Sequence, residues 1–97
     1  MNVTISNHKR RYRSFTMTIP VKTWEDLGSP LELVLSHDNF GPILRQPLLN
    51  DTEFSKASVE KTRVQFYFTY HKIDVEPGKY SIEQNEDDSE VYLLEKL

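Results

Sequence analysis

The chain contains no cysteine, only three glycines and a single alanine, Ala57. Without cysteine, neither a disulfide framework nor a thiolate zinc site is possible. The scarcity of glycine argues against a glycine-rich phosphate-binding loop, and none of the known loop motifs occurs. Alanine is the strongest helix former, so its scarcity disfavours a mainly helical protein.

Long apolar runs are also missing. No stretch approaches the ~18 residues of a membrane span, and none near the N-terminus has the length of a signal-peptide core. We therefore expect the protein to remain in the cytoplasm of the cell that produces it or of an infected cell. The lack of cysteine agrees with that reducing compartment.

Residues that favour strands are abundant instead. Valine, isoleucine and threonine supply 19 of the 97 residues, and aromatic residues make up 11% of the chain. β-Branched and aromatic side chains pack well on a pleated sheet. No repeat or linker divides the sequence, so we expect residues 1–97 to form one compact domain. The predicted fold is mainly β: a small antiparallel β-sandwich or open barrel of about five to seven strands with one or two short helices.

Three segments carry the clearest strand pattern. Apolar and polar residues alternate over 14–21, 31–36 and 63–70, as in strands buried on one face. A shorter alternation at Val3 and Ile5 predicts a first strand that pairs with the segment 14–21. The expected core comprises Phe15, Met17, Ile19, Leu33, Leu35, Val64, Phe66, Phe68, Ile82 and Leu93.

The remaining segments are less regular. Residues 23–28 resemble one helical turn, capped by Thr23 and stopped by Gly28. Residues 37–50 contain two prolines and a glycine, which predicts a long loop. Residues 51–62 are expected to form a short helix.

Within the loop expected at 37–50, apolar side chains should hold the segment to the core. They are Phe40, Ile43, Leu44, Leu48 and Leu49.

The C-terminal quarter predicts a hairpin that follows a turn at Pro77–Gly78. A bend at His71–Lys72 is expected before it, because the apolar parity changes there. Residues 91–94 are apolar on both parities. This pattern fits either a central strand covered on both faces or a strand exposed for a partner.

Charge is separated along the chain. Residues 1–24 carry five basic and no acidic residues, whereas residues 73–97 carry eight acidic and two basic residues. The basic cluster contains Tyr12, an aromatic ring that suits base stacking, among side chains that suit phosphate contacts. The alternative is a solvated hairpin turn whose arginines pair with the acidic segment near residues 86–90.

No catalytic constellation is visible. The three histidines lack the spacing of a metal-binding helix, and no nucleophile motif occurs. A metal site from His37, Asp38 and His71 is a weaker alternative to their reading as turn residues. We therefore expect a protein that is not an enzyme and binds no cofactor or metal.

Three classes of function remain. The first is a binding or regulatory protein that acts by occupying a protein partner, as phage- or plasmid-encoded inhibitors of host enzymes do. The second is a small β-barrel that binds nucleic acid through the basic N-terminal segment and Tyr67. The third is an assembly subunit, monomeric or homodimeric, that pairs through its C-terminal strand. The predicted partner-binding residues are Lys9, Arg10, Arg11, Tyr12, Arg13, Glu86, Asp87, Asp88 and Tyr92.

Overall fold

The computed structural model describes residues 1–9, 13–38, 41–69 and 75–97. Strands make up 56% of the protein and helix 8%, which confirms the mainly β prediction. The elements in chain order are β1 (Asn2–Lys9), β2 (Arg13–Pro20), α1 (Val21–Asp26), β3 (Glu32–Asp38), β4 (Gly41–Arg45), β5 (Ser55–Lys56), β6 (Ser58–Val59), β7 (Arg63–Thr69), β8 (Gly78–Gln84) and β9 (Val91–Lys96).

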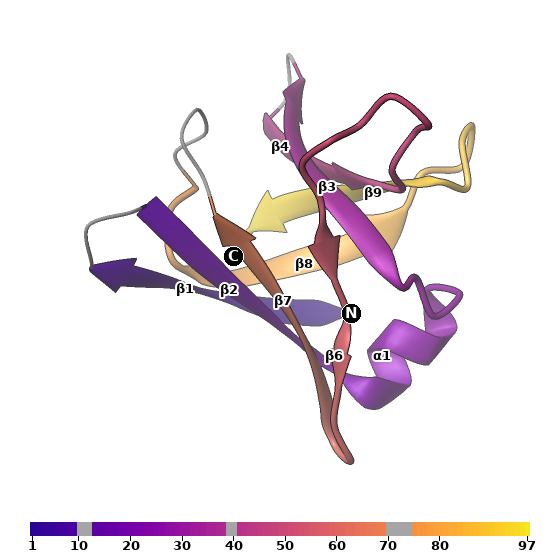
Figure 1. Cartoon of the computed structure of the whole chain (residues 1–97). Coiled ribbons are helices and arrows are strands. Elements are labelled where there is room, and N and C mark those ends of the chain that lie inside the picture. The colour runs from indigo at the N-terminus through magenta and orange to yellow at the C-terminus, as the bar shows by residue number, and fades with distance from the viewer. Residues whose placement is uncertain (10–12, 39–40, 70–74) are drawn as a thin grey trace.

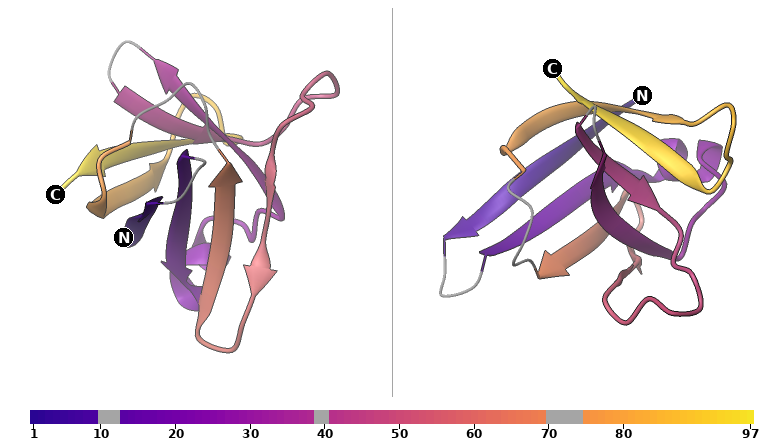
Figure 2. Two further views of the ribbon diagram at one scale, coloured as in Figure 1. Left: turned by 60° about the vertical axis from the view of Figure 1, so that its left-hand side comes forward. Right: turned by 90° about the horizontal axis from the view of Figure 1, so that it is seen from above.

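The strands form one antiparallel sheet that curls into a nearly closed barrel (Figures 1 and 2). Its strand order is β5-β3-β4-β9-β8-β1-β2-β7-β6. The described residues form nine strands, more than the five to seven expected from the sequence. The near closure of the barrel also replaces the sandwich alternative.

A short extended segment closes the barrel. β5 and β6, the two ends of the strand order, are separated in the chain only by Ala57. On one side Lys56 pairs with Glu32 of β3, and on the other Ser58 pairs with Gln65 of β7. One segment thereby covers both edges, which would otherwise expose unpaired backbone groups. The helix expected at 51–62 is therefore wrong, because pairing with two strand edges outweighs a weak helical pattern.

The inner face of the barrel is filled by the predicted alternating side chains. Phe66 and Val64 of β7 and Ile19 of β2 are completely buried. Each predicted core residue is buried except Leu93, which lies on the outer face while its neighbour Leu94 points inward. The loop predicted at 37–50 is also partly wrong, because residues 41–45 form β4 and bury Leu44.

Helix α1 lies against one end of the barrel (Figure 1). It begins two residues earlier than expected: Pro20 occupies the N-cap position without a side-chain cap, so the predicted cap at Thr23 is wrong. Gly28, with a φ of 94°, follows its end as predicted. Trp24 packs on the core, and its indole N–H donates to the Pro30 carbonyl at 2.9 Å.

Two further predictions concern the connection after β7. The predicted bend at His71–Lys72 lies outside the described residues. Gly78 is the first residue of β8, and the neighbours of β8 in the sheet are β9 and β1, not β7. Pro77–Gly78 forms no turn, because Gly78 is already part of β8, and the strands belong to a single sheet, so the prediction of a turn there is wrong. No helix in the described ranges is long and apolar enough to cross a membrane.

Candidate functional site

The predicted acidic residues lie on the loop between β8 and β9. Glu86, Asp87 and Asp88 are all exposed. The Glu90 amide donates to Asp88 Oδ1 at 3.0 Å, and the Asp87 amide donates to Asn85 Oδ1 at 2.9 Å. These local bonds define the turn. Asp88 therefore has a structural role, while Glu86 and Asp87 face solvent.

The acidic loop and the strand ends at Lys9 and Arg13 lie at opposite ends of the sheet. β1 and β8 are antiparallel, with Val3 opposite Tyr80, so β1 runs away from the acidic loop toward Lys9. Lys9 lies six residues from Val3 in one direction, and Gln84 lies four residues from Tyr80 in the other. The two positions are therefore about ten residues apart, or roughly 30 Å along the strands. Lys9 and Arg13 face each other at that far end. The predicted pairing of the arginines with the acidic loop involves Arg10 and Arg11, which lie outside the described residues.

Most of the predicted basic site lies outside the described residues. Arg10, Arg11 and Tyr12 lie outside the described residues, and only the backbone of Lys9 and Arg13 is described. The same holds for the alternative metal site. His37 and Asp38 end β3, their side chains are not described, and His71 is outside the described ranges. Within the described ranges, no three acidic or histidine side chains gather as a metal-binding group.

Tyr92 is not a surface residue. It is 1% exposed, and its hydroxyl donates to the Leu27 carbonyl at 3.1 Å inside the barrel. β9 lies between β4 and β8, so it is a central strand of the sheet. Of its apolar run, Tyr92 and Leu94 point inward, and Val91 and Leu93 are half-buried on the outer face. The prediction of Tyr92 as a partner contact is therefore wrong.

The most exposed large apolar side chain of the described residues, Leu49, lies on the loop after β4 beside a second exposed leucine, Leu48. Leu49 is fully exposed and Leu48 is 58% exposed. The sequence predicted that both would hold the loop to the core, and that prediction is wrong. Adjacent exposed leucines are unfavourable in water, whereas single ones are common on protein surfaces.

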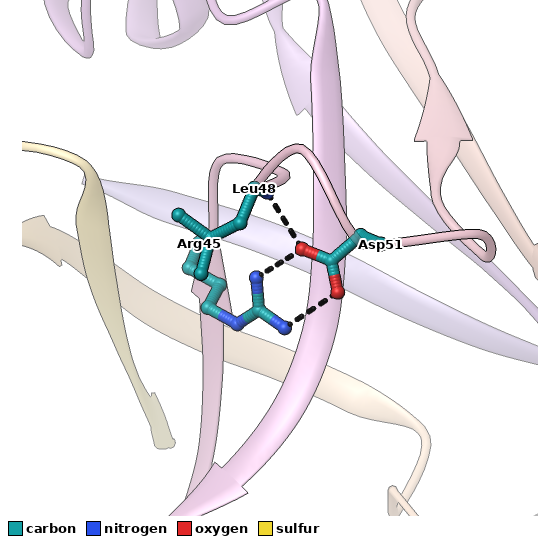
Figure 3. Close-up of polar contacts among 3 residues, drawn as sticks. All are labelled: Arg45, Leu48 and Asp51. Carbon is teal, nitrogen blue, oxygen red and sulfur yellow. Dashed lines mark hydrogen bonds and ion pairs between the residues drawn. The ribbon is translucent and has the colours of Figure 1, made fainter.

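An ion pair holds these leucines in place (Figure 3). Arg45, at the end of β4, binds Asp51 through both terminal nitrogens, at 2.7 and 3.0 Å. The same carboxylate accepts the Leu48 amide at 2.6 Å, and the Asp51 amide donates back to the Leu48 carbonyl at 3.0 Å. Residues 48–51 are thus closed into a turn with Leu49 at its corner.

The electrostatics agree with this geometry. The hydrogen bond from Arg45, followed by that from the Leu48 amide, lowers the pKa of Asp51 to about 2. The hydrogen bond to Asp51 also raises the pKa of Arg45. Both side chains keep less than a third of their surface exposed. A bidentate, partly covered pair restrains a loop more strongly than an ordinary surface ion pair.

The sequence contained a signal for this site that was missed. Arg45 and Asp51 flank a proline and two leucines, but the sequence pattern assigns Arg45 to a loop over 37–50 and Asp51 to a helix over 51–62. Asn50 precedes Asp51, and both residue types favour turns. What the pattern lacked was any indication that the leucines face outward, because exposure depends on where the barrel wall passes.

Comparison with known proteins does not assign this site. No protein-family model matches the chain, no curated protein matches it in sequence, and no solved structure matches it. The candidate function is therefore argued from the geometry of the loop.

Proposed function

We propose that this protein binds another protein and acts by occupying an apolar pocket on it, with the loop of residues 46–54 as the contact. The observation that carries the proposal is the pair of exposed leucines on a turn closed by Arg45 and Asp51. The loop stands out from the barrel in both views of Figure 2. No chemistry by the chain itself is required for this action.

The free energy of burying the two leucines favours a protein pocket as the place where the loop binds. Burying one leucine side chain contributes about 1.5–3 kcal/mol, so two supply a useful share of a binding free energy. The turn is already closed in the free protein. Binding therefore does not have to order it, which lowers the entropic cost of association.

The charge of the loop favours a protein over a nucleic acid. Residues 46–54 include Asp51 and Glu53 and no basic residue. Nucleic-acid binding depends on cationic side chains that neutralise phosphates. The nucleic-acid alternative would have to use the basic turn near Lys9 and Arg13, about which the loop geometry says nothing.

The test compares partner capture by tagged variants from a native lysate. Replacing both Leu48 and Leu49 by serine removes the apolar contact while leaving the ion pair intact. The matched control is Leu31→Ser, because Leu31 is also exposed, at 65%, but lies outside the loop.

We expect the amount of captured protein to fall at least tenfold with the double variant and to stay unchanged with the control. Nuclease treatment should not change either amount. Equal capture by both variants would refute the role of the loop. Capture that disappears with nuclease would favour the nucleic-acid alternative.

A further inference from the structure

A second feature lies on the outer face of the barrel, away from the loop tip. An open groove of about 380 Å³ runs between β4 on one side and β8 and β9 on the other. Ile43 and Leu93 are directly paired across β4 and β9 and give it an apolar floor. Glu83, Glu95 and Ser81 form the opposite side.

Pro42 explains why the groove exists. The amide of Gln46, the residue after β4, donates to the Glu90 carbonyl. The backbone nitrogen of every second residue back from Gln46 therefore points toward β9, and Pro42 is one of these residues. The pairing of β4 with β9 ends at Ile43 and Leu93, one residue short of Pro42. Proline has no N–H to donate, so the ladder cannot continue to Leu94. The Leu94 carbonyl therefore has no N–H donor at that position of β4, and Leu94 lines the groove.

The polar side of the groove is acidic. Ser81 pairs with Glu95 and Glu83 pairs with Leu93, so the two carboxylates sit diagonally on one face of the β8–β9 hairpin. Such diagonal positions are about 7–8 Å apart. Neither carboxylate forms an ion pair within the described part of the chain, and no basic side chain lines the groove there.

This combination suits one kind of side chain. Arginine and lysine lay an apolar stem along hydrophobic surface and keep a charged head at a polar edge. Here the stem would lie on Ile43 and Leu93. The head would lie between Glu83 and Glu95, where charge-assisted hydrogen bonds are strong.

We propose that the groove binds an arginine or lysine side chain from an extended, basic segment of a protein partner. The segment lies beside β9, and one of its backbone N–H groups donates to the Leu94 carbonyl, which receives no N–H from Pro42. The inference rests on the proposed function only in that the ligand belongs to a protein. The residues involved are different from those of the loop.

The test uses a defined probe and the whole protein. An acetylated, amidated Val-Thr-Arg-Thr-Val peptide is titrated into ¹⁵N-labelled protein while amide chemical shifts are followed. The companion probe has citrulline in place of arginine, which keeps the shape and removes the charge. We expect saturable shifts at the amides of Ile43, Leu93 and Glu95 with the arginine peptide. Binding should weaken about tenfold or more with citrulline.

Two variants locate the binding. Glu83→Gln combined with Glu95→Gln should weaken the arginine peptide about tenfold. The matched control, Glu86→Gln with Asp87→Asn, removes the same charge from the acidic loop and should change affinity less than twofold. Equal loss in both double variants would overturn the assignment, because a general charge effect would then suffice.

Three further outcomes would overturn part or all of the proposal. Free arginine amide that binds as tightly as the peptide would overturn the extended segment and indicate a small cation. Self-association that disappears in the Glu83 and Glu95 double variant would overturn the separate partner. It would assign the groove to basic residues of a second copy. No shifts with either peptide would overturn the proposal altogether.

The groove and the loop are distinguishable in these experiments. The variant with serine at Leu48 and Leu49 should bind the arginine peptide normally, because neither leucine lines the groove. If the peptide fails to bind while partner capture still depends on the leucines, only the groove proposal falls. If capture ignores the leucines while the peptide binds, only the loop proposal falls.

Discussion

Truncating Phe66 to alanine tests the inward face of the barrel most directly. Phe66 is 0% exposed at the middle of β7, opposite Met17 of β2, and its ring stacks on Phe68 with centroids 6.4 Å apart. Removing a fully buried phenylalanine side chain costs about 3–5 kcal/mol, from lost transfer energy and the cavity left behind. A domain of this size has about 5–15 kcal/mol of stability in total.

The expected shift in melting temperature follows from the chain length. An unfolding entropy of ~2.1 cal/mol/K per residue gives about 0.2 kcal/mol/K for a chain of this length. A loss of 3–5 kcal/mol therefore lowers Tm by about 15–25 °C. Thermal unfolding followed by circular dichroism measures this shift. Phe66→Leu, which keeps most of the apolar contact, should cost less and serves if the alanine variant does not fold.

The adjacent residue provides the control. Tyr67 has a similar size but is 55% exposed on the outer face, where its hydroxyl donates to Gln65 at 3.0 Å. Tyr67→Ala should lower Tm by only a few degrees, because it loses little burial and one exposed hydrogen bond. Similar shifts for Phe66→Ala and Tyr67→Ala would refute the assignment of inner and outer faces along β7.

Two more predictions concern polar groups. Tyr92→Phe removes the hydroxyl that donates to the Leu27 carbonyl. Because a buried acceptor then loses its donor, the free energy of unfolding measured in urea should fall by about 1–3 kcal/mol. An unchanged unfolding midpoint would contradict this buried hydrogen bond. Asp51 has a folded-state pKa of about 2, below its ordinary 3.8, so its pairing stabilises the fold above about pH 4 and is lost as the pH falls toward 2. Asp51→Asn should therefore be less stable than the wild type at pH 7, and the difference should shrink as the pH falls through 2 and vanish below it. A difference that persists unchanged below pH 2 would exclude the ion pair as its source.

The candidate site was only partly accessible from the sequence. The charges at residues 86–88 are exposed as expected, because acidic turn residues rarely have any other location. Leu48 and Leu49 were assigned to the core because leucine is usually buried. Their exposure follows from the turn that Arg45 and Asp51 close, and a contact between side chains six positions apart has no periodic signature.

The groove illustrates the same limit. The sequence pattern predicts Pro42 only as part of a loop. Its effect depends on which strand lies beside it, because a missing N–H matters only where a neighbouring carbonyl needs it. That neighbour, β9, follows about fifty residues later in the chain.

Local sequence patterns were sufficient to predict the β class and the inward faces of β2, β3 and β7. Period-two alternation is a local property, and in these strands one parity carries most of the apolar residues. It could not decide β9, where Leu93 and Leu94 are both apolar and only the packing around Tyr92 selects the inward one. It also could not show that residues 55–59 are extended. Barrel closure depends on two edges meeting in space, and the free energy of pairing them belongs to the whole sheet rather than to any local segment.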